Sequence, residues 1–217
     1  IFPVAIKASD PGINLIEEDM TSGFNRLTFN KSHKFLDYKK LIYKRKALDQ
    51  YELIAQLDSK VSQFVDTSSV SNENQVKYRM RLKQGTAVSL YGENFNSIHL
   101  TVKPGQDTFS WLFEWNPLES GHRRADKYYL KAGRDKNNLK TIAIKSSLDF
   151  SHIHFYPPYG KMHYQVVAVQ NITGEEVTVA KSNFIALLNF SHSREKNPDK
   201  SYVYPNPCHE TLYFKNQ

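Results

Sequence analysis

Histidines are the residues of this chain whose type and spacing come closest to metal chemistry. His152 and His154 lie two residues apart on an expected strand, so their rings face the same side, a spacing that metal sites use. A metal site needs a further ligand, and His122 and His163 are too distant along the chain to be placed there. We favour the other interpretation, two histidines on a sheet face, so the sequence predicts no metal and no cofactor.

Covalent or acid–base catalysis has weak support in the sequence. Cys208, the one cysteine, lies in a proline-rich tail where we expect no preorganised pocket, and a single cysteine excludes an internal disulfide framework. The carboxylates are scattered, without a pair at corresponding strand ends. The glycines occur singly at turns, unlike a phosphate-binding loop. We therefore predict no catalytic residues and a protein that is not an enzyme.

Positive charge is the other feature of the sequence that could serve a binding function. The chain carries 29 Lys and Arg against 22 Asp and Glu, a net charge of +7, spread along the chain rather than gathered in the single stripe of a nucleic-acid-binding domain. The densest stretches, 38–46 and 77–81, are interpreted as solvated faces of strands. The alternative is contact with an anionic polymer or a membrane surface. The residues that would make that contact are Lys39, Lys40, Arg45, Lys77, Arg79 and Arg81.

Composition points to strands as the elements that position these side chains. Aromatic residues make up 13% of the chain and β-branched residues are frequent, which favours strands over helices. No apolar run approaches the roughly 20 residues of a membrane-spanning helix. The chain begins at Ile1 without a Met or a leader, and we expect a fragment or mature form of a longer protein that is monomeric.

An internal repeat organises the chain. Four pairs of similar residues are separated by 86 residues, or 88 in one case. This spacing predicts two copies of a module of about 90 residues. We expect domains at 1–92 and 93–190, followed by a linker and tail at 191–217. The paired residues are Phe29 and Trp115, Tyr43 and Tyr129, Ile54 and Ile142, and Tyr78 and Tyr164.

Within each copy, short alternating runs separated by turn signals predict two antiparallel β-sandwiches in tandem. Trp111, Phe113 and Trp115 share one face of a strand, as residues at period two must. Tyr78 and Tyr164 stand near the start of each sixth strand. We expect their hydroxyls to turn back onto upstream backbone and pin the corner between the sheets.

These patterns resemble the fibronectin type III module. The likeness rests on L-x-F/W in the second strand, Y-x-L/I in the third, Y-x-V-x-A in the sixth, "FVDTSSV" (64–70) as the fifth strand and "VAKSNFIAL" (179–187) as the closing one. Phe29 departs from the family's usual Trp, and "SHIHFYPP" lacks its usual aspartate. The resemblance covers about residues 1–190 and implies immunoglobulin-like β-sandwiches. The junction 91–105 is similar to junctions in tandem pairs on surface proteins of Bacteroidetes-type bacteria.

The tail contains a second resemblance. "VYPNPCHETLYF" is similar to the start of the C-terminal sorting sequence of the type IX secretion system of those bacteria, of which only the first strand would be present. The alternative is a proline-rich linker that matches by chance. If the resemblance holds, it implies a protein that is secreted or held at the outer cell surface. The matching residues are Tyr204, Pro205, Asn206, Pro207, Leu212 and Phe214.

Three functions follow for such a chain. The leading one is a non-enzymatic spacer, adhesion or interaction module of an exported bacterial surface protein, with other proteins or polysaccharides at the cell surface and the type IX machinery as partners. The second is the accessory region of an extracellular hydrolase. The third is binding of carbohydrate or an anionic polymer by the basic face, with tyrosines for stacking. The short linker 92–97 predicts an elongated pair with a restricted hinge. Nucleic acid and a membrane span are not expected.

Overall fold

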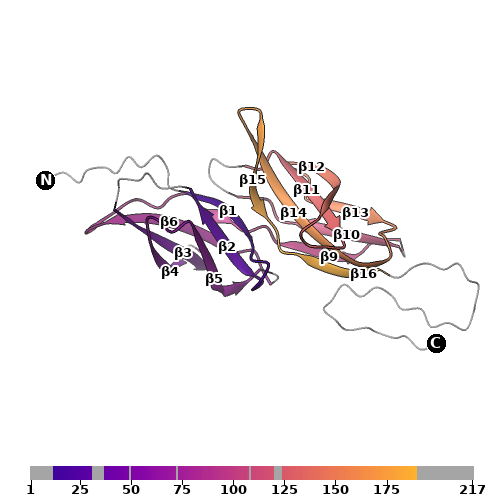
Figure 1. Ribbon diagram of the computed structural model, residues 1–217, viewed down its shortest axis with the longest axis horizontal. Helices are drawn as coiled ribbons and strands as arrows, with labels where there is room; N and C mark the ends of the chain where they lie inside the picture. Colours follow the sequence, from indigo (N-terminus) through magenta and orange to yellow (C-terminus); the bar gives the residue numbers. More distant parts are fainter. Residues whose placement is uncertain are drawn as a thin grey trace, which may run out of the picture.

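The computed structural model describes residues 12–30, 37–48, 50–71, 73–107, 109–119 and 124–189. All regular elements in these ranges are β-strands, so the all-β prediction is confirmed. Figure 1 shows two bodies of strands in succession along the long axis of the molecule. No helix of the described residues is long and apolar enough to span a membrane. The predicted sorting residues, Tyr204 to Pro207 with Leu212 and Phe214, lie outside the described residues.

The first body, called here the first sandwich, contains two antiparallel sheets. One has the order β1-β2-β5, and the other has the order β4-β3-β6-β7 with β8 also on β6. The strands are β1 (Ile13–Glu18), β2 (Phe24–Phe29), β3 (Lys39–Ala47), β4 (Gln50–Asp58), β5 (Gln63–Val70), β6 (Lys77–Gln84), β7 (Ala87–Val88) and β8 (Phe95–Asn96). Leu27, Ile42 and Tyr78 are fully buried in its core. Their burial follows from apolar residues at every second position of β2, β3 and β6.

The second body, called here the second sandwich, repeats this order. β10 lies between β9 and β13, while β12, β11 and β14 follow one another in the facing sheet and β14 also pairs with β15 and β16. The strands are β9 (Leu100–Pro104), β10 (Ser110–Trp115), β11 (Lys127–Gly133), β12 (Lys140–Ser146), β13 (Ser151–Phe155), β14 (Gly160–Ile172), β15 (Glu175–Lys181) and β16 (Ile185–Asn189). The repeated strand order confirms the two tandem β-sandwiches expected from the repeat.

A continuous sheet joins the two sandwiches, and the sequence did not predict it. β1 pairs in parallel with β15 at Ile16 and Ala180, which links the strands in the order β12-β11-β14-β15-β1-β2-β5. Both strands would otherwise expose an unpaired edge. Figure 1 shows β15 reaching from the second sandwich to β1 of the first. The modules are therefore connected by strand pairing as well as by the chain.

Two carboxylates at the end of β1 strengthen this connection. The Glu17 carboxylate lies 2.7 Å from Lys181 Nζ. Glu18 is buried, and its Oε2 accepts hydrogen bonds from the backbone N–H of Phe184 at 2.8 Å and from Ser71 Oγ at 2.9 Å. Ser71 belongs to the first sandwich and Phe184 to the second, so one carboxylate holds a donor from each body.

The junction between the modules begins as part of the first sandwich. Phe95 and Asn96 form β8, which pairs with Tyr78 and Lys77 of β6, although they lie beyond residue 92. Asn96 also donates a hydrogen bond to the carbonyl of Pro117 in the second sandwich. Residues on both sides of the expected boundary are thus engaged in structure, and the division at 92 stays a prediction.

Candidate functional site

Three tyrosine rings and two guanidinium groups stack on the outer surface of the β4-β3-β6 sheet. Arg79 Cζ lies 4.1 Å from the centroid of the Tyr51 ring and 5.6 Å from that of Tyr91. Arg81 Cζ lies 4.5 Å from the Tyr91 centroid. The Tyr43 ring meets Tyr91 edge-on at 5.2 Å and 77°. These five residues, Tyr43, Tyr51, Arg79, Arg81 and Tyr91, are called the arginine–tyrosine face.

Strand alternation places these residues on one side of the sheet. In β6, Tyr78 and Met80 are buried in the core, so Arg79 and Arg81 must point to the opposite side. Tyr43 of β3 is the cross-strand partner of Arg79. The face therefore combines local alternation with antiparallel register.

Hydrogen bonds hold the stacked groups in place. Arg79 Nε donates to Asn94 Oδ1, which also accepts from the Tyr51 hydroxyl at 3.0 Å. Arg81 Nε donates to the carbonyl of Ser89 at 2.7 Å. None of the ion pairs between described residues involves either arginine. Each guanidinium has five N–H donors, and the bond from Nε uses only one of them.

The other four residues of the predicted anionic contact have different environments. Lys39 is exposed on β3, opposite Lys83 of β6. Arg45 is partly exposed, and its Nε donates to the carbonyl of Ala47 at 3.2 Å. Lys77 forms an ion pair with Glu119 of the second sandwich, so its charge is used at the junction.

The prediction for Lys40 is wrong, because this side chain is only 1% exposed. It points into the sandwich, where Nζ donates to the carbonyls of Ser59 at 2.7 Å and Val61 at 2.5 Å and lies 5.1 Å from the Phe29 ring centroid. Burial lowers the pKa of this ammonium group. Lys40 stands two positions before the buried Ile42, and that alternation is the signal that could have placed it inside.

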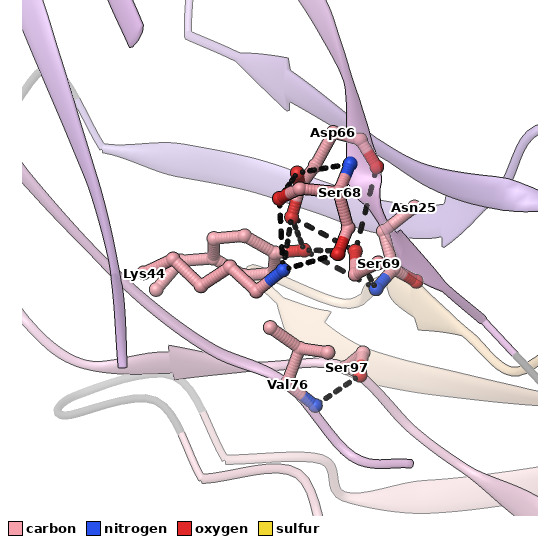
Figure 2. A network of polar contacts seen from close by, with 8 residues as sticks. Asn25, Lys44, Asp66, Ser68, Ser69, Val76 and Ser97 are labelled. Atoms are coloured by element: carbon pink, nitrogen blue, oxygen red, sulfur yellow. Dashed lines mark hydrogen bonds and ion pairs between the residues drawn. The ribbon is translucent and has the colours of Figure 1, made fainter. Parts of the chain in front are cut away.

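A buried polar network lies within the same sandwich (Figure 2). The Tyr78 hydroxyl donates to Asp66 Oδ2 at 2.9 Å and accepts from Asn25 Nδ2 at 3.2 Å. Ser69 Oγ lies 3.1 Å from the same hydroxyl and donates to Asp66 Oδ2 at 2.8 Å. The expected bond from Tyr78 to upstream backbone is therefore replaced by bonds to upstream side chains. In the second sandwich the Tyr164 hydroxyl lies 3.5 Å from His154 Nδ1, again a side chain.

The network holds its groups in defined ionisation states. Burial raises the pKa of Asp66, but hydrogen bonds from Ser68, Ser69 and Tyr78 outweigh that effect and lower it below the usual value. Burial, together with the negative charge of Asp66, raises the pKa of Tyr78. The carboxylate and the neutral phenol therefore persist at ordinary pH and act as a fixed acceptor and donor.

A serine and a lysine lie together at the rim of this network. Lys44 Nζ donates to Ser68 Oγ at 2.9 Å and to the Ser68 carbonyl, and it lies 3.3 Å from Asp66 Oδ2 (Figure 2). A nucleophilic serine needs a neighbouring group that accepts its proton. Here Ser68 Oγ donates to Asp66 Oδ1 at 2.5 Å, but the lowered pKa of this carboxyl group makes it a weak base that is poorly suited to remove the serine proton. The arrangement orders the β5 strand rather than activating Ser68.

The two histidines of β13 lie near each other as predicted. The ring centroids of His152 and His154 are 6.4 Å apart, and burial lowers the pKa of both. Within the described residues no group of three or more His, Cys, Asp or Glu side chains could hold a metal ion. His122 and Cys208 lie outside the described residues.

The chain is similar to solved structures of fibronectin type III domains. No protein-family model and no curated protein matches the chain. One similar solved structure is that of the chicken CNTN1 FN1-FN3 domains, with 11% identity and a TM-score of 0.33 over 85% of this chain and 64% of that chain. Another is a two-domain fibronectin type III segment from chicken tenascin, with 12% identity and a TM-score of 0.33 over 83% of this chain and 94% of that chain. This chain thus spans less than two thirds of the first. The strand order of each sandwich defines the class as a tandem of immunoglobulin-like β-sandwiches.

Proposed function

We propose that this chain is a non-enzymatic spacer and interaction module of an exported bacterial surface protein. The observation that supports a spacer is the continuous sheet from β12 to β5 through the β1–β15 pair. A spacer has to hold a fixed distance between its ends, and modules joined by a flexible linker alone would not do so. Strand pairing and the contacts of Glu17 and Glu18 oppose such hinge motion.

The location at the bacterial surface is part of the same proposal. It is supported by the likeness of residues 204–214 to the start of a type IX sorting sequence. Labelling of intact cells with a membrane-impermeant lysine reagent tests it, because an exported protein is labelled before the cells are broken and an internal one only afterwards.

Small-angle scattering tests the spacer. We expect a single elongated particle for the wild-type chain. Glu17→Lys places a positive charge against Lys181 and should broaden the distribution of interatomic distances, because like charges repel across the joint. Glu17→Lys with Lys181→Glu restores opposite charges and should restore the narrow distribution. Glu114→Lys is the control, because its ion pair with Lys103 lies within the second sandwich.

Two results would reject the spacer. One is scattering from the wild-type chain that requires an ensemble of widely different arrangements. The other is a Glu17→Lys effect no greater than that of Glu114→Lys, since the contacts at the joint would then have no role in fixing it.

The arginine–tyrosine face supports a second candidate function, that of the accessory, ligand-binding region of an extracellular hydrolase. Arginines held against tyrosine rings, with N–H donors left for further hydrogen bonds, are suited to binding a ligand. The sequence of the full-length protein separates the two, because a hydrolase requires a catalytic domain attached to this chain.

A further inference from the structure

We propose that the arginine–tyrosine face binds a linear acidic polysaccharide, with arginine forks holding the acidic groups and tyrosine rings contacting the sugars. This rests on the proposed role as an interaction module and names its ligand. Four features of the face support this ligand: the spacing of the guanidinium groups, their fixed orientation, the exposed apolar surface beside them and the charge of the surrounding sheet.

The spacing of the arginines suits a polymer. Arg79 and Arg81 are two residues apart on β6, so their Cα atoms are about 7 Å apart. Guanidinium groups recognise carboxylate and sulfate by paired, parallel hydrogen bonds. Two such groups along one strand can hold acidic groups on successive parts of a single chain. A small monovalent anion would use only one of them.

The orientation of the guanidinium groups is already set. Tyr51 and Tyr91 stack against them, and Asn94 and the Ser89 carbonyl each accept one Nε–H. A long side chain that is ordered before binding loses less conformational entropy when a ligand arrives. Cation–π stacking also leaves the in-plane N–H groups of an arginine available for hydrogen bonds.

Apolar surface lies beside these charges. Tyr91 is 44% exposed, and Leu53, the cross-strand neighbour of Tyr43 on β4, is 51% exposed. A sugar ring has an apolar face of C–H groups, and an acidic sugar also carries a carboxylate or a sulfate. The arginine–tyrosine face offers charged and apolar contacts on one sheet surface. A ligand recognised by charge alone would not need the apolar contacts.

The surrounding charge is complementary to an anionic polymer. Lys39 and Lys83 are cross-strand partners at one end of the face, and Arg45 lies toward the other. Asp58 is opposite Lys39 at the margin of the sheet. A line of cations along β3 and β6 therefore extends beyond the two stacked arginines and would attract a long polyanion more than a short one.

Calorimetric titration of the complete chain tests the proposal. The probes are polygalacturonate, dextran sulfate, neutral dextran, poly-glutamate and single-stranded DNA. We expect binding of polygalacturonate or dextran sulfate, no binding of neutral dextran, and at least tenfold weaker binding of poly-glutamate and DNA. Affinity should fall as salt is raised, because exposed charges carry part of it.

Matched variants locate the site. Arg79→Gln with Arg81→Gln should weaken polysaccharide binding at least tenfold. Arg134→Gln with Lys140→Gln removes the same charge from the second sandwich and should leave binding unchanged. Arg79→Lys with Arg81→Lys keeps the charge and should still lose several-fold, because lysine cannot form the paired hydrogen bonds. Tyr91→Ala should also lose several-fold. Urea midpoints of the variants show that they remain folded.

Each contrary result is decisive. Equal binding of poly-glutamate or DNA, a failure of both acidic polysaccharides to bind, or equal weakening by the control pair would overturn the proposal. Scattering on the same samples separates it from the spacer: absent binding with an elongated rigid particle rejects only the ligand. A flexible ensemble rejects the spacer whether or not polysaccharide binds.

Discussion

Replacing Tyr78 by phenylalanine removes one hydroxyl group from the centre of the buried network in the first sandwich. Asp66 Oδ2 would lose its 2.9 Å hydrogen bond and Asn25 Nδ2 its 3.2 Å acceptor, while the ring would keep its apolar contacts. Asp66 would retain Ser69 at 2.8 Å and Lys44 at 3.3 Å, and Asn25 would retain Ser69 Oγ at 3.3 Å. Neither group becomes an isolated buried charge or donor.

The expected cost follows from those contacts. A hydrogen bond to a charged group contributes about 1.5–3 kcal/mol and a neutral one about 1 kcal/mol, and partial compensation by Ser69 reduces the sum. We therefore expect Tyr78→Phe to lower the free energy of unfolding by about 2 kcal/mol. With a urea slope of about 1–3 kcal/mol/M, the midpoint should move by about 1 M.

Tyr164→Phe is the matched control, because Tyr164 holds the equivalent position of the second sandwich and is also fully buried. Its hydroxyl lies 3.5 Å from His154 Nδ1 and interacts with the neutral Asn189 side chain, and burial raises its pKa to about 12. We expect a cost of about 1 kcal/mol or less. If Tyr78→Phe lowers the free energy of unfolding by no more than Tyr164→Phe does, the hydrogen bond from Tyr78 to Asp66 does not provide the additional stability that we expect.

Two further predictions concern acid and base. Burial raises the pKa of Glu18, and the hydrogen bonds from Phe184 and Ser71 only partly oppose this, so stability is lost as pH rises from 4.5 through the raised pKa. In urea titrations Glu18→Gln should therefore be more stable than the wild type at pH 7 and have no advantage at pH 4. An advantage at both pH values would contradict this. Burial lowers the pKa of His154, so stability is lost as pH falls from 6.5 through the lowered pKa. In His154→Gln the free energy of unfolding should fall less between pH 7 and pH 5 than in the wild type. An equal fall in both proteins would count against this.

Alternation within strands was the most reliable signal in the sequence. It placed Arg79 and Arg81 outside and Tyr78 and Met80 inside, and the structure agrees. Lys40 shows how the same signal was underused, since its place two residues before Ile42 indicates an inward side chain despite its charge. The ammonium is tolerated there because two backbone carbonyls accept its hydrogen bonds.

The sequence did not predict which residues these outward and inward side chains contact. Tyr51 and Tyr91 come from β4 and from the segment after β7, and nothing local indicates that they cover Arg79. Asp66 likewise meets Tyr78 across twelve positions of sequence. Strand register and turn length decide such contacts, and both depend on how the whole sheet assembles.

By itself, the sequence determined that this chain is all-β, that it repeats one module and which face of each strand is apolar. These are properties of residue type and of a period of two, which hold in any antiparallel sandwich. Only the tertiary structure decided that β1 pairs with β15 and that Glu17 meets Lys181, 164 positions away. The physical reason is that an edge strand will accept any compatible edge, so the partner is chosen by how the two sandwiches meet.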